Sequence, residues 1–354
     1  MARRTERPTG PLDPRSQRIL RAIIEEYIVT AEPVGSQTLV DRYGLAVSSA
    51  TVRNVMAELE DAGYLSHPHT SAGRVPTDAG YRLYIEAIDP RISLAPVERL
   101  MIRHQFGQVE FASEQWFRLA AATIAGTTHA AGLATPAKPR SCRLRHIDLV
   151  ATSTRAASLV IVLAEGSVKQ ELVPLDEPYD QHELDDIARL LNAELANKSA
   201  RQVANRLAAL ADEADTPPLA LRATQRVEKM MREFDAAGVE DVFSDGLLNV
   251  MSEPEFSHSE KLRRVFAALQ NRDYLGSLLA RLASAGDVQV YIGAENESDE
   301  MRDVSLILAA YGQPGRALGV VGVLGPTRMA YPHAIGTVRY VSGLMNELVE
   351  QMYR

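Results

Sequence analysis

Residues 47–85 have the sequence VSSATVRNVMAELEDAGYLSHPHTSAGRVPTDAGYRLYI, and this stretch decides the fold of the N-terminal part of the chain. Ser48 is a preferred helix N-cap and Gly63 a helix stop signal, so a helix is predicted between them. Its inner face is predicted from apolar side chains at helical spacing, which are Val52, Val55, Met56 and Leu59. Residues 65–76 are punctuated by proline and glycine, which predicts two short strands around a turn. A further helix is predicted over residues 78–88.

Two more helices are predicted upstream of this stretch. Residues 16–30 carry apolar side chains in two neighbouring rows of one helical face. Pro33 and Gly35 then break the chain, and residues 36–43 form a short second helix that Gly44 ends. Helix, short turn, helix and strand pair follow one another as in a winged helix-turn-helix. The N-terminal part of the chain is therefore predicted to bind duplex DNA.

The outward face of the predicted third helix has the size and chemistry needed for base contacts. Its side chains are small or polar, which lets a helix enter the major groove. Arg53 can pair with guanine and Asn54 with adenine through two parallel hydrogen bonds. The residues expected to contact DNA are Arg4, Arg7, Ser36, Gln37, Ser48, Ser49, Thr51, Arg53, Asn54, His69, Thr70, Ser71 and Arg74. The alternative is that the three helices pack without DNA and that this face is merely solvated.

Charge and composition bound the remaining possibilities. The formal net charge of the 354 residues is −8, so DNA binding must depend on a local basic patch. Residues 1–21 hold six arginines against two acidic residues, an arm that contacts phosphate unless it is a disordered terminus. The single cysteine, Cys142, excludes an intramolecular disulfide. No apolar run is long enough to span a bilayer and no signal peptide is recognisable, so a cytoplasmic protein without membrane association is expected.

Downstream of the N-terminal part, strands, helices and strands again follow one another. Strands are predicted at residues 145–151, 156–164, 168–173, 288–292, 304–310 and 318–324. Helices are predicted at residues 97–134 with a break near Gly107, at 180–235, at 259–283 and at 334–353. The economical interpretation is an α+β protein whose downstream sheet domain is interrupted by a mainly helical insertion. The expected domains are residues 1–90, 91–176, 177–255 and 256–354, of which the second and fourth form one sheet domain.

One stripe in the predicted insertion offers a dimer interface. Its members recur at helical spacing and are Ile187, Leu190, Leu191 and Leu195. Two DNA-binding modules held on one dimer contact both halves of an inverted repeat, and the second contact becomes effectively intramolecular. The stripe is therefore expected to dimerise. The alternative is that it packs inside its own subunit.

Two segments carry a resemblance to a known family. Residues 47–85 closely resemble the N-terminal domain of the bacterial heat-inducible transcription repressor HrcA, and GPTRMAYPHAI, residues 325–335, resembles that family's C-terminal signature. The resemblance implies a winged helix domain, a GAF-like domain and an inserted dimerisation domain. It also implies a stress-response repressor of chaperone operons that binds an inverted-repeat operator as a homodimer, occludes the promoter and is released on heat stress. The GroE chaperonin is implied as a partner.

No enzymatic activity, metal or cofactor is expected from the sequence. Gly319, Gly322 and Gly325 fit neither a dinucleotide fingerprint nor a phosphate loop, and close strand packing explains them better. Arg328 is left open between binding an anion and fixing a turn. The alternative function is a winged-helix regulator whose GAF-like domain senses a small molecule. A pocket with converging polar groups would favour that alternative.

Overall fold

The computed structural model describes residues 12–68, 73–109, 113–137, 141–164, 166–236, 242–256, 263–265, 267, 278, 281–282, 287–313 and 317–352. These residues divide into two compact units. The first unit comprises the described residues up to 136, 241–311 and 319–348, and the second comprises 137–240, 312–318 and those from 349 onward. No helix in the described ranges is long and apolar enough to cross a bilayer.

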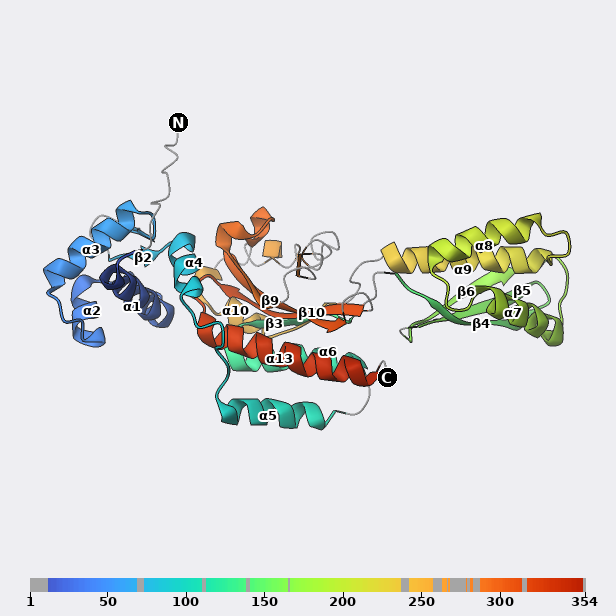
Figure 1. Ribbon diagram of the computed structural model, residues 1–354, viewed down its shortest axis with the longest axis horizontal. Helices are drawn as coiled ribbons and strands as arrows, with labels where there is room; N and C mark the ends of the chain where they lie inside the picture. The colour runs from blue at the N-terminus through green and yellow to red at the C-terminus, as the bar shows by residue number, and fades with distance from the viewer. Residues whose placement is uncertain are drawn as a thin grey trace, which may run out of the picture. The chain divides into compact units, whose positions relative to one another are not determined.

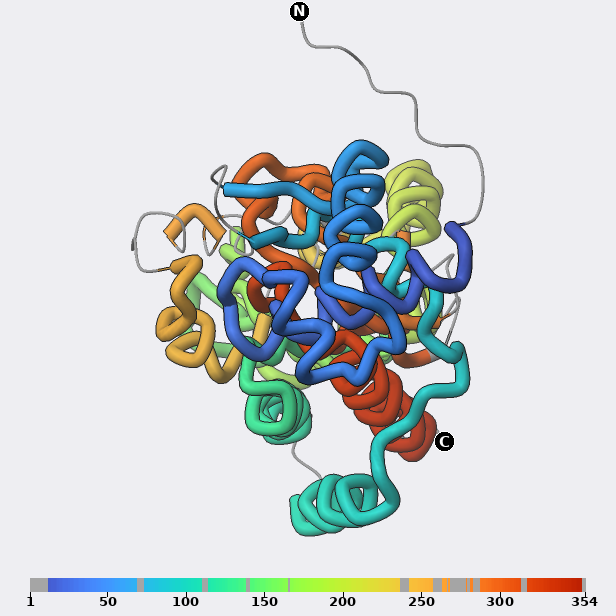
Figure 2. Tube along the Cα trace, turned by 90° about the vertical axis from the view of Figure 1, so that its left-hand side faces the viewer, coloured from blue at the N-terminus to red at the C-terminus, as the bar shows by residue number. Residues whose placement is uncertain are grey.

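The N-terminal part of the first unit, residues 12–88, is called the head here. Its elements are α1 (Pro14–Thr30), α2 (Ser36–Tyr43), α3 (Ser49–Asp61), β1 (Leu65–Ser66), β2 (Val75–Pro76) and α4 (Asp78–Glu86). The three first helices, blue in Figures 1 and 2, enclose an apolar centre to which Ile23, Leu39 and Val52 contribute side chains with no exposed surface. β1 and β2 pair antiparallel. The predicted order of helices and strands is confirmed for this part of the chain.

Side-chain caps fix where the head helices begin. The Asp13 carboxylate caps α1, and the Ser16 hydroxyl that donates to it lowers the pKa of Asp13. The Ser48 hydroxyl accepts from the backbone N–H of Thr51 at 3.2 Å and starts α3, as the sequence predicts. Each cap satisfies donors that the first helical turn leaves without a partner, so short helices can begin at defined residues.

The rest of the first unit, called the core, is built on a five-stranded sheet. Its strands are β3 (Ala131–Ala134), β7 (Phe243–Asp245), β8 (Gln289–Ile292), β9 (Val304–Gln313) and β10 (Ala317–Pro326), in the spatial order β7-β3-β10-β9-β8. Its helices are α5 (Pro96–Gly107), α6 (Ser113–Thr128), α10 (Leu247–Met251) and α13 (Tyr331–Met352), with the short turns η1 (Pro254–Phe256), η2 (Gly293–Glu295) and η3 (Asp299–Met301). Leu306, Leu308 and Leu324 pack with Val250 of α10 in one buried cluster. α6 and α13 lie beside the sheet, and α5 lies outside them (Figures 1 and 2).

The predicted break near Gly107 in the helical stretch over residues 97–134 is confirmed, since α5 ends there, but the end of the stretch is wrong, because residues 131–134 form a strand. α6 ends after Thr128, where His129 takes a left-handed backbone conformation with a φ of 53°. β3 then approaches α6 so closely that a Cβ at Gly132 would overlap the carbonyl oxygen of Ala121. Only glycine fits such a backbone contact. The small side chains of this stretch carry no period that separates helix from strand, which is why the sequence-based assignment failed.

The second unit, called the insertion, has its own antiparallel sheet. Its strands are β4 (Leu144–Ser153), β5 (Ala156–Leu163) and β6 (Val168–Pro174), in the order β4-β5-β6, and its helices are α7 (Gln181–Leu195), α8 (Ala200–Asp212) and α9 (Pro218–Ala236). The domain boundaries predicted from the sequence are wrong here. The insertion begins near residue 137 rather than 177 and ends near residue 240 rather than 255, because these three strands form a separate sheet.

The α7 stripe that was expected to dimerise packs inside the insertion. Ile187, Leu191 and Leu195 belong to the buried cluster between the helices and the inner face of the sheet, and the last two have no exposed surface. Leu190 is 37% exposed. The prediction is wrong for the three buried residues, since helical spacing identifies a buried face without saying what covers it. For Leu190 it stays untested.

This packing makes a testable prediction about two adjacent leucines of α7. Leu191→Ala should lower the free energy of unfolding by about 2–5 kcal/mol, because it leaves a cavity in a closed apolar cluster. Leu190→Ala is the matched control and should stay within about 0.5 kcal/mol of the parent protein. Urea denaturation followed by circular dichroism measures both. Equal and small effects of the two substitutions would contradict the assignment of Leu191 to the interior.

Candidate nucleic-acid interface

The interior of the head positions α3 through its inner face. Val52, Val55 and Leu59 are buried, and Val52 has no exposed surface at all. A hydroxyl contact of 3.0 Å joins Ser36, the first residue of α2, to Ser49, the first residue of α3. The N-termini of the two helices are therefore joined by a side-chain contact.

The outer face of α3 is free of intramolecular contacts where the sequence predicts base contacts. Arg53 and Asn54 are exposed. Within the described residues neither side chain makes a hydrogen bond or ion pair. Ser48 is exposed at the N-cap, while Ser49 and Thr51 are half-buried. The helix thus offers one guanidinium and one amide on a rigid support, with no internal competitor for their donors and acceptors.

The N-terminus of α2 lies close to that of α3 and is less open. The Ser36 side chain is buried, at 9% exposure, and its hydroxyl is used by Ser49. Gln37 is exposed, and its amide donates to the Asp41 carboxylate at 2.8 Å one turn later. Ser36 therefore acts on the arrangement of the two helices, whereas Gln37 can exchange its solvent-exposed partner for an external one.

Arg74, expected to contact DNA, is held by the head itself. Its guanidinium Nε lies 2.6 Å from the Glu60 carboxylate at the end of α3, and the His67 ring contacts the same carboxylate. Its backbone forms two 2.9 Å hydrogen bonds with Val34, and a Cβ at Gly73 would overlap the Val34 carbonyl. Arg74 thus fixes the base of the strand pair to the segment before α2. The sequence analysis missed Glu60, because no local spacing links residues fourteen apart across a turn.

Five of the predicted DNA contacts cannot be placed. Arg4 and Arg7 of the basic arm, and His69, Thr70 and Ser71 of the turn between β1 and β2, lie outside the described residues. Their roles remain predictions from the sequence. The strands on either side of the turn are described, so its two ends are fixed by β1 and β2.

A buried acid that the sequence analysis did not single out braces the head. Glu26 of α1 is 5% exposed and accepts from the Arg42 guanidinium of α2 at 2.6 Å. Tyr43 lies beside them, and burial, reinforced by the negative charge of Glu26, raises the pKa of its hydroxyl. A carboxylate buried to this degree needs such a partner. The pair therefore sets how α2, and with it α3, lies on α1.

Charged contacts also join the head to the core within the first unit. The Arg82 guanidinium of α4 binds both oxygens of Glu295, which raises the pKa of Arg82, and donates to the Val290 carbonyl at 2.7 Å. Arg328, which the sequence left open, is only 12% exposed; it pairs with Glu253 and Glu255 and donates to the Ile28 carbonyl of α1 at 3.3 Å. The guanidinium of Arg328 is thus paired with carboxylates of the protein itself, and Arg328 links α1 to the segment that carries Glu253 and Glu255.

Two tyrosines occupy the centre of this contact. The rings of Tyr81 and Tyr331 lie 5.8 Å apart between centroids, and burial raises the pKa of both hydroxyls. Neither hydroxyl therefore ionises near neutral pH. Across the described ranges, no group of three or more histidine, cysteine, aspartate or glutamate residues could hold a metal ion. The chemistry of the head is that of an exposed polar helix on a braced support.

Known proteins of one family match this chain over most of its length. Residues 114–335 match the family described as HrcA protein C terminal domain. The chain is 43% identical to the heat-inducible transcription repressor HrcA of Roseiflexus castenholzii over 98% of this chain and 96% of that protein. It is 44% identical to the protein of the same name from Herpetosiphon aurantiacus over 97% and 96%. A crystal structure titled as a hypothetical protein has the same fold, with a TM-score of 0.64 and 23% identity over 97% of this chain and all of that one.

Substitutions at Ser48 test whether its side chain fixes the start of α3. Ser48→Ala should lower the free energy of unfolding by about 1 kcal/mol, because the Thr51 N–H loses its acceptor. Ser48→Asp should leave the free energy of unfolding unchanged, because the aspartate side chain also accepts this hydrogen bond. Ser66→Ala, at an exposed serine of β1, is the control and should change little. Urea denaturation gives all three values. A Ser48→Ala protein as stable as the parent would mean that the cap does not fix the start of α3.

Proposed function

The chain belongs to the HrcA family of heat-inducible transcription repressors, and from this we propose that it represses heat-shock genes by binding an inverted-repeat operator through the outer face of α3. The observation that carries the proposal is the pair Arg53 and Asn54, exposed on a braced helix and without a partner in the described residues. The names of the matched relatives are those of repressors rather than enzymes.

In this proposal the head is a winged helix-turn-helix. α3 enters the major groove, Arg53 donates to the O6 and N7 atoms of guanine, and Asn54 forms two hydrogen bonds with adenine. Ser48 and Ser49 bring the free N–H groups of the α3 N-terminus to a phosphate, and Gln37 and Thr51 flank that contact. The order α1, α2, α3, β1, β2, α4 supports this interpretation.

The turn between β1 and β2 is the proposed wing. Its residues His69, Thr70 and Ser71 would contact the DNA backbone beside the groove, while Arg74 holds the wing against α3 through Glu60. Arg4 and Arg7 would neutralise further phosphates from the N-terminal arm. Because the chain is acidic overall, with a net charge of −8, such local cations must supply the attraction.

The core is proposed to be the GAF-like domain of the family, and the insertion its dimerisation domain. With the α7 stripe buried, the insertion offers a different surface: the face of its sheet turned away from the helices. Apolar side chains on that face are Val150, Val160, Val162, Val168 and Leu172, and pairs such as Val162 and Val168 lie directly opposite each other on adjacent strands. The same face also carries the polar residues His146, Asp148, Ser158 and Gln170. Val150, Val168 and Leu172 are 46%, 60% and 60% exposed.

A second copy of the chain is the proposed occupant of this face. The same face of a second copy could bury these apolar side chains about a twofold axis, with the polar residues of the two copies meeting between them. Two heads held in this way would bind both halves of the operator and occlude the promoter. Heating, or loss of assistance from the GroE chaperonin, would release the DNA by reducing the amount of correctly folded dimer.

The main test of the proposed function is Arg53→Ala. The probe is duplex DNA carrying an inverted repeat from upstream of the chaperone genes of the organism that encodes this chain. The variant should bind it about 1–3 kcal/mol more weakly and lose base preference at one position in each half-site. Arg118→Ala on α6, an exposed arginine paired with Glu114, is the control and should bind as the parent does. Unchanged affinity and base preference of the Arg53 variant would remove Arg53 from the interface.

Charged substitutions on the sheet face and on the helical face of the insertion test the proposed dimer. Val168→Glu with Leu172→Glu should give a folded monomer with much weaker operator binding, because four buried charges would meet at the proposed interface. Leu190→Glu, on the helical side, should leave the dimer intact. Sedimentation gives the mass and circular dichroism the folded state. A dimeric double variant would place the interface elsewhere, and a monomeric Leu190→Glu protein would return it to α7.

A further inference from the structure

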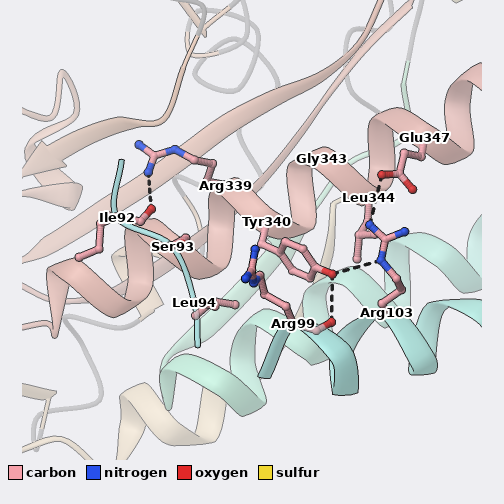
Figure 3. A pocket seen from close by; sticks show the side chains of 11 residues that line it. Ile92, Ser93, Leu94, Arg99, Arg103, Arg339, Tyr340, Gly343, Leu344 and Glu347 are labelled. Carbon is pink, nitrogen blue, oxygen red and sulfur yellow. Dashed lines mark hydrogen bonds and ion pairs between the residues drawn. The ribbon is translucent and has the colours of Figure 1, made fainter. Parts of the chain in front are cut away.

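A small cavity lies in the core between α5, α13 and the segment that joins the head to α5. Its volume is about 230 Å³. Three parts of the chain far apart in the sequence form its walls: Ile92 to Leu94 before α5, Arg99 and Arg103 on α5, and Tyr340 to Glu347 on α13 (Figure 3). All of them belong to the first compact unit.

Two arginines of α5 face this cavity from the same side of their helix. Arg99 and Arg103 are four residues apart, so they are neighbours on the helix surface, and like charges at this spacing repel each other. Figure 3 shows both side chains directed toward Tyr340 of α13. Within the described residues the Arg99 guanidinium has neither a hydrogen bond nor an ion pair. In the described part of the chain, Arg99 therefore offers a guanidinium without an internal partner beside the cavity.

The internal partners of Arg103 are weak. Its Nε donates to the Tyr340 hydroxyl at 3.4 Å, and its terminal nitrogen lies 3.4 Å from the Glu347 carboxylate. Both charged side chains are more than half exposed, so this ion pair contributes little and can be displaced. An anion with geometry suited to the guanidinium fork would bind Arg103 better than Glu347 does.

The third arginine of the cavity, Arg339, holds the wall of the cavity together. Arg339 of α13 donates to the Ile92 carbonyl at 2.8 Å and lies 3.3 Å from the Asp287 carboxylate. It thereby holds the joining segment on α13, and Leu94, 3% exposed, packs there. Ile92, Leu94 and Leu344 give the cavity apolar walls.

Glycine keeps the cavity open on the α13 side. Gly343 lines it, and a Cβ built there meets no atom within 4 Å. Gly336, one end of the same wall, lies 3.4 Å by the same measure from the backbone of Ser93 and Leu94. A Cβ at Gly336 would thus be in ordinary contact with the joining segment, whereas at Gly343 the space beside the helix is unfilled.

We propose that this cavity binds a small organic dianion, a phosphomonoester or a dicarboxylate with a body of a few carbon atoms, whose charged end lies between Arg99 and Arg103. Arginine's planar fork matches carboxylate and phosphate oxygens, which accounts for the charged end. The apolar walls and a volume below that of drug-sized pockets account for the short body. The proposal concerns binding to the core and does not depend on DNA recognition by the head.

Isothermal titration of the full chain at constant ionic strength tests the proposal with three probes. Glycerol 3-phosphate represents the phosphomonoesters, succinate the dicarboxylates, and inorganic phosphate the charge without a body. At least one organic probe should bind with one site per chain and more tightly than inorganic phosphate. The organic probe that binds identifies the class. Absence of saturable binding for both, up to on the order of 10 mM, would overturn the proposal.

Four variants give a pattern that nonspecific binding would not reproduce. Arg99→Gln should weaken binding about tenfold or more, as expected for one lost charged hydrogen bond. Glu347→Gln should tighten it, because a competing carboxylate is removed. Gly343→Leu should abolish it by filling the cavity, and its thermal unfolding should show no loss of stability, since leucine favours a helix. Arg118→Gln, outside the cavity, should bind as the parent does. Binding that Arg99→Gln leaves unchanged, or that Glu347→Gln weakens, would place the anion elsewhere.

Discussion

The DNA binding proposed for the head depends on one constraint, the division of α3 into two faces. One face must be buried deeply enough to hold a 13-residue helix in place, and Val52, Val55 and Leu59 achieve this. The other face must stay free, because an arginine already paired inside the protein has less to offer a base. Glu60 shows the boundary between the two demands, since it binds Arg74 at the end of α3 and leaves Arg53 alone. The same helix is thus part of the core of the head and its exposed surface.

Ion pairs with one largely buried member extend this constraint from the head to the core. Glu26 with Arg42 sets the angle of α2 on α1, and Arg328 with two glutamates ties the core to the end of α1. Removing the partner of Glu26 or of Arg328 would leave a largely buried charge uncompensated, which is destabilising. Such contacts tolerate little change of geometry, so they make the support of α3 specific as well as stable.

The sequence predicted what depends on local chemistry and failed where distant segments decide. Caps such as Ser48 and the short period of α3 are local, and the head was predicted well. The strands from Leu144 to Pro174 were predicted as strands, but they were assigned to the wrong sheet. Strand propensity does not indicate which other strand a segment pairs with. The burial of Leu191 and the grip of Glu60 on Arg74 depend on the same kind of long-range contact. The cavity beside Gly343 could not be predicted either, since it needs α5 and α13 together.

Only the contacts made in the fold show which arginines of this chain are paired and which are free to bind a ligand. The net charge is −8, and many arginines, among them Arg82, Arg206 and Arg328, are used by nearby carboxylates. An arginine without a partner on a flexible loop can simply be hydrated. Arg53 and Arg99 instead lie on helices, so the backbone that carries each side chain is fixed although the guanidinium groups are exposed. Such preorganisation lowers the entropic cost of binding an anion.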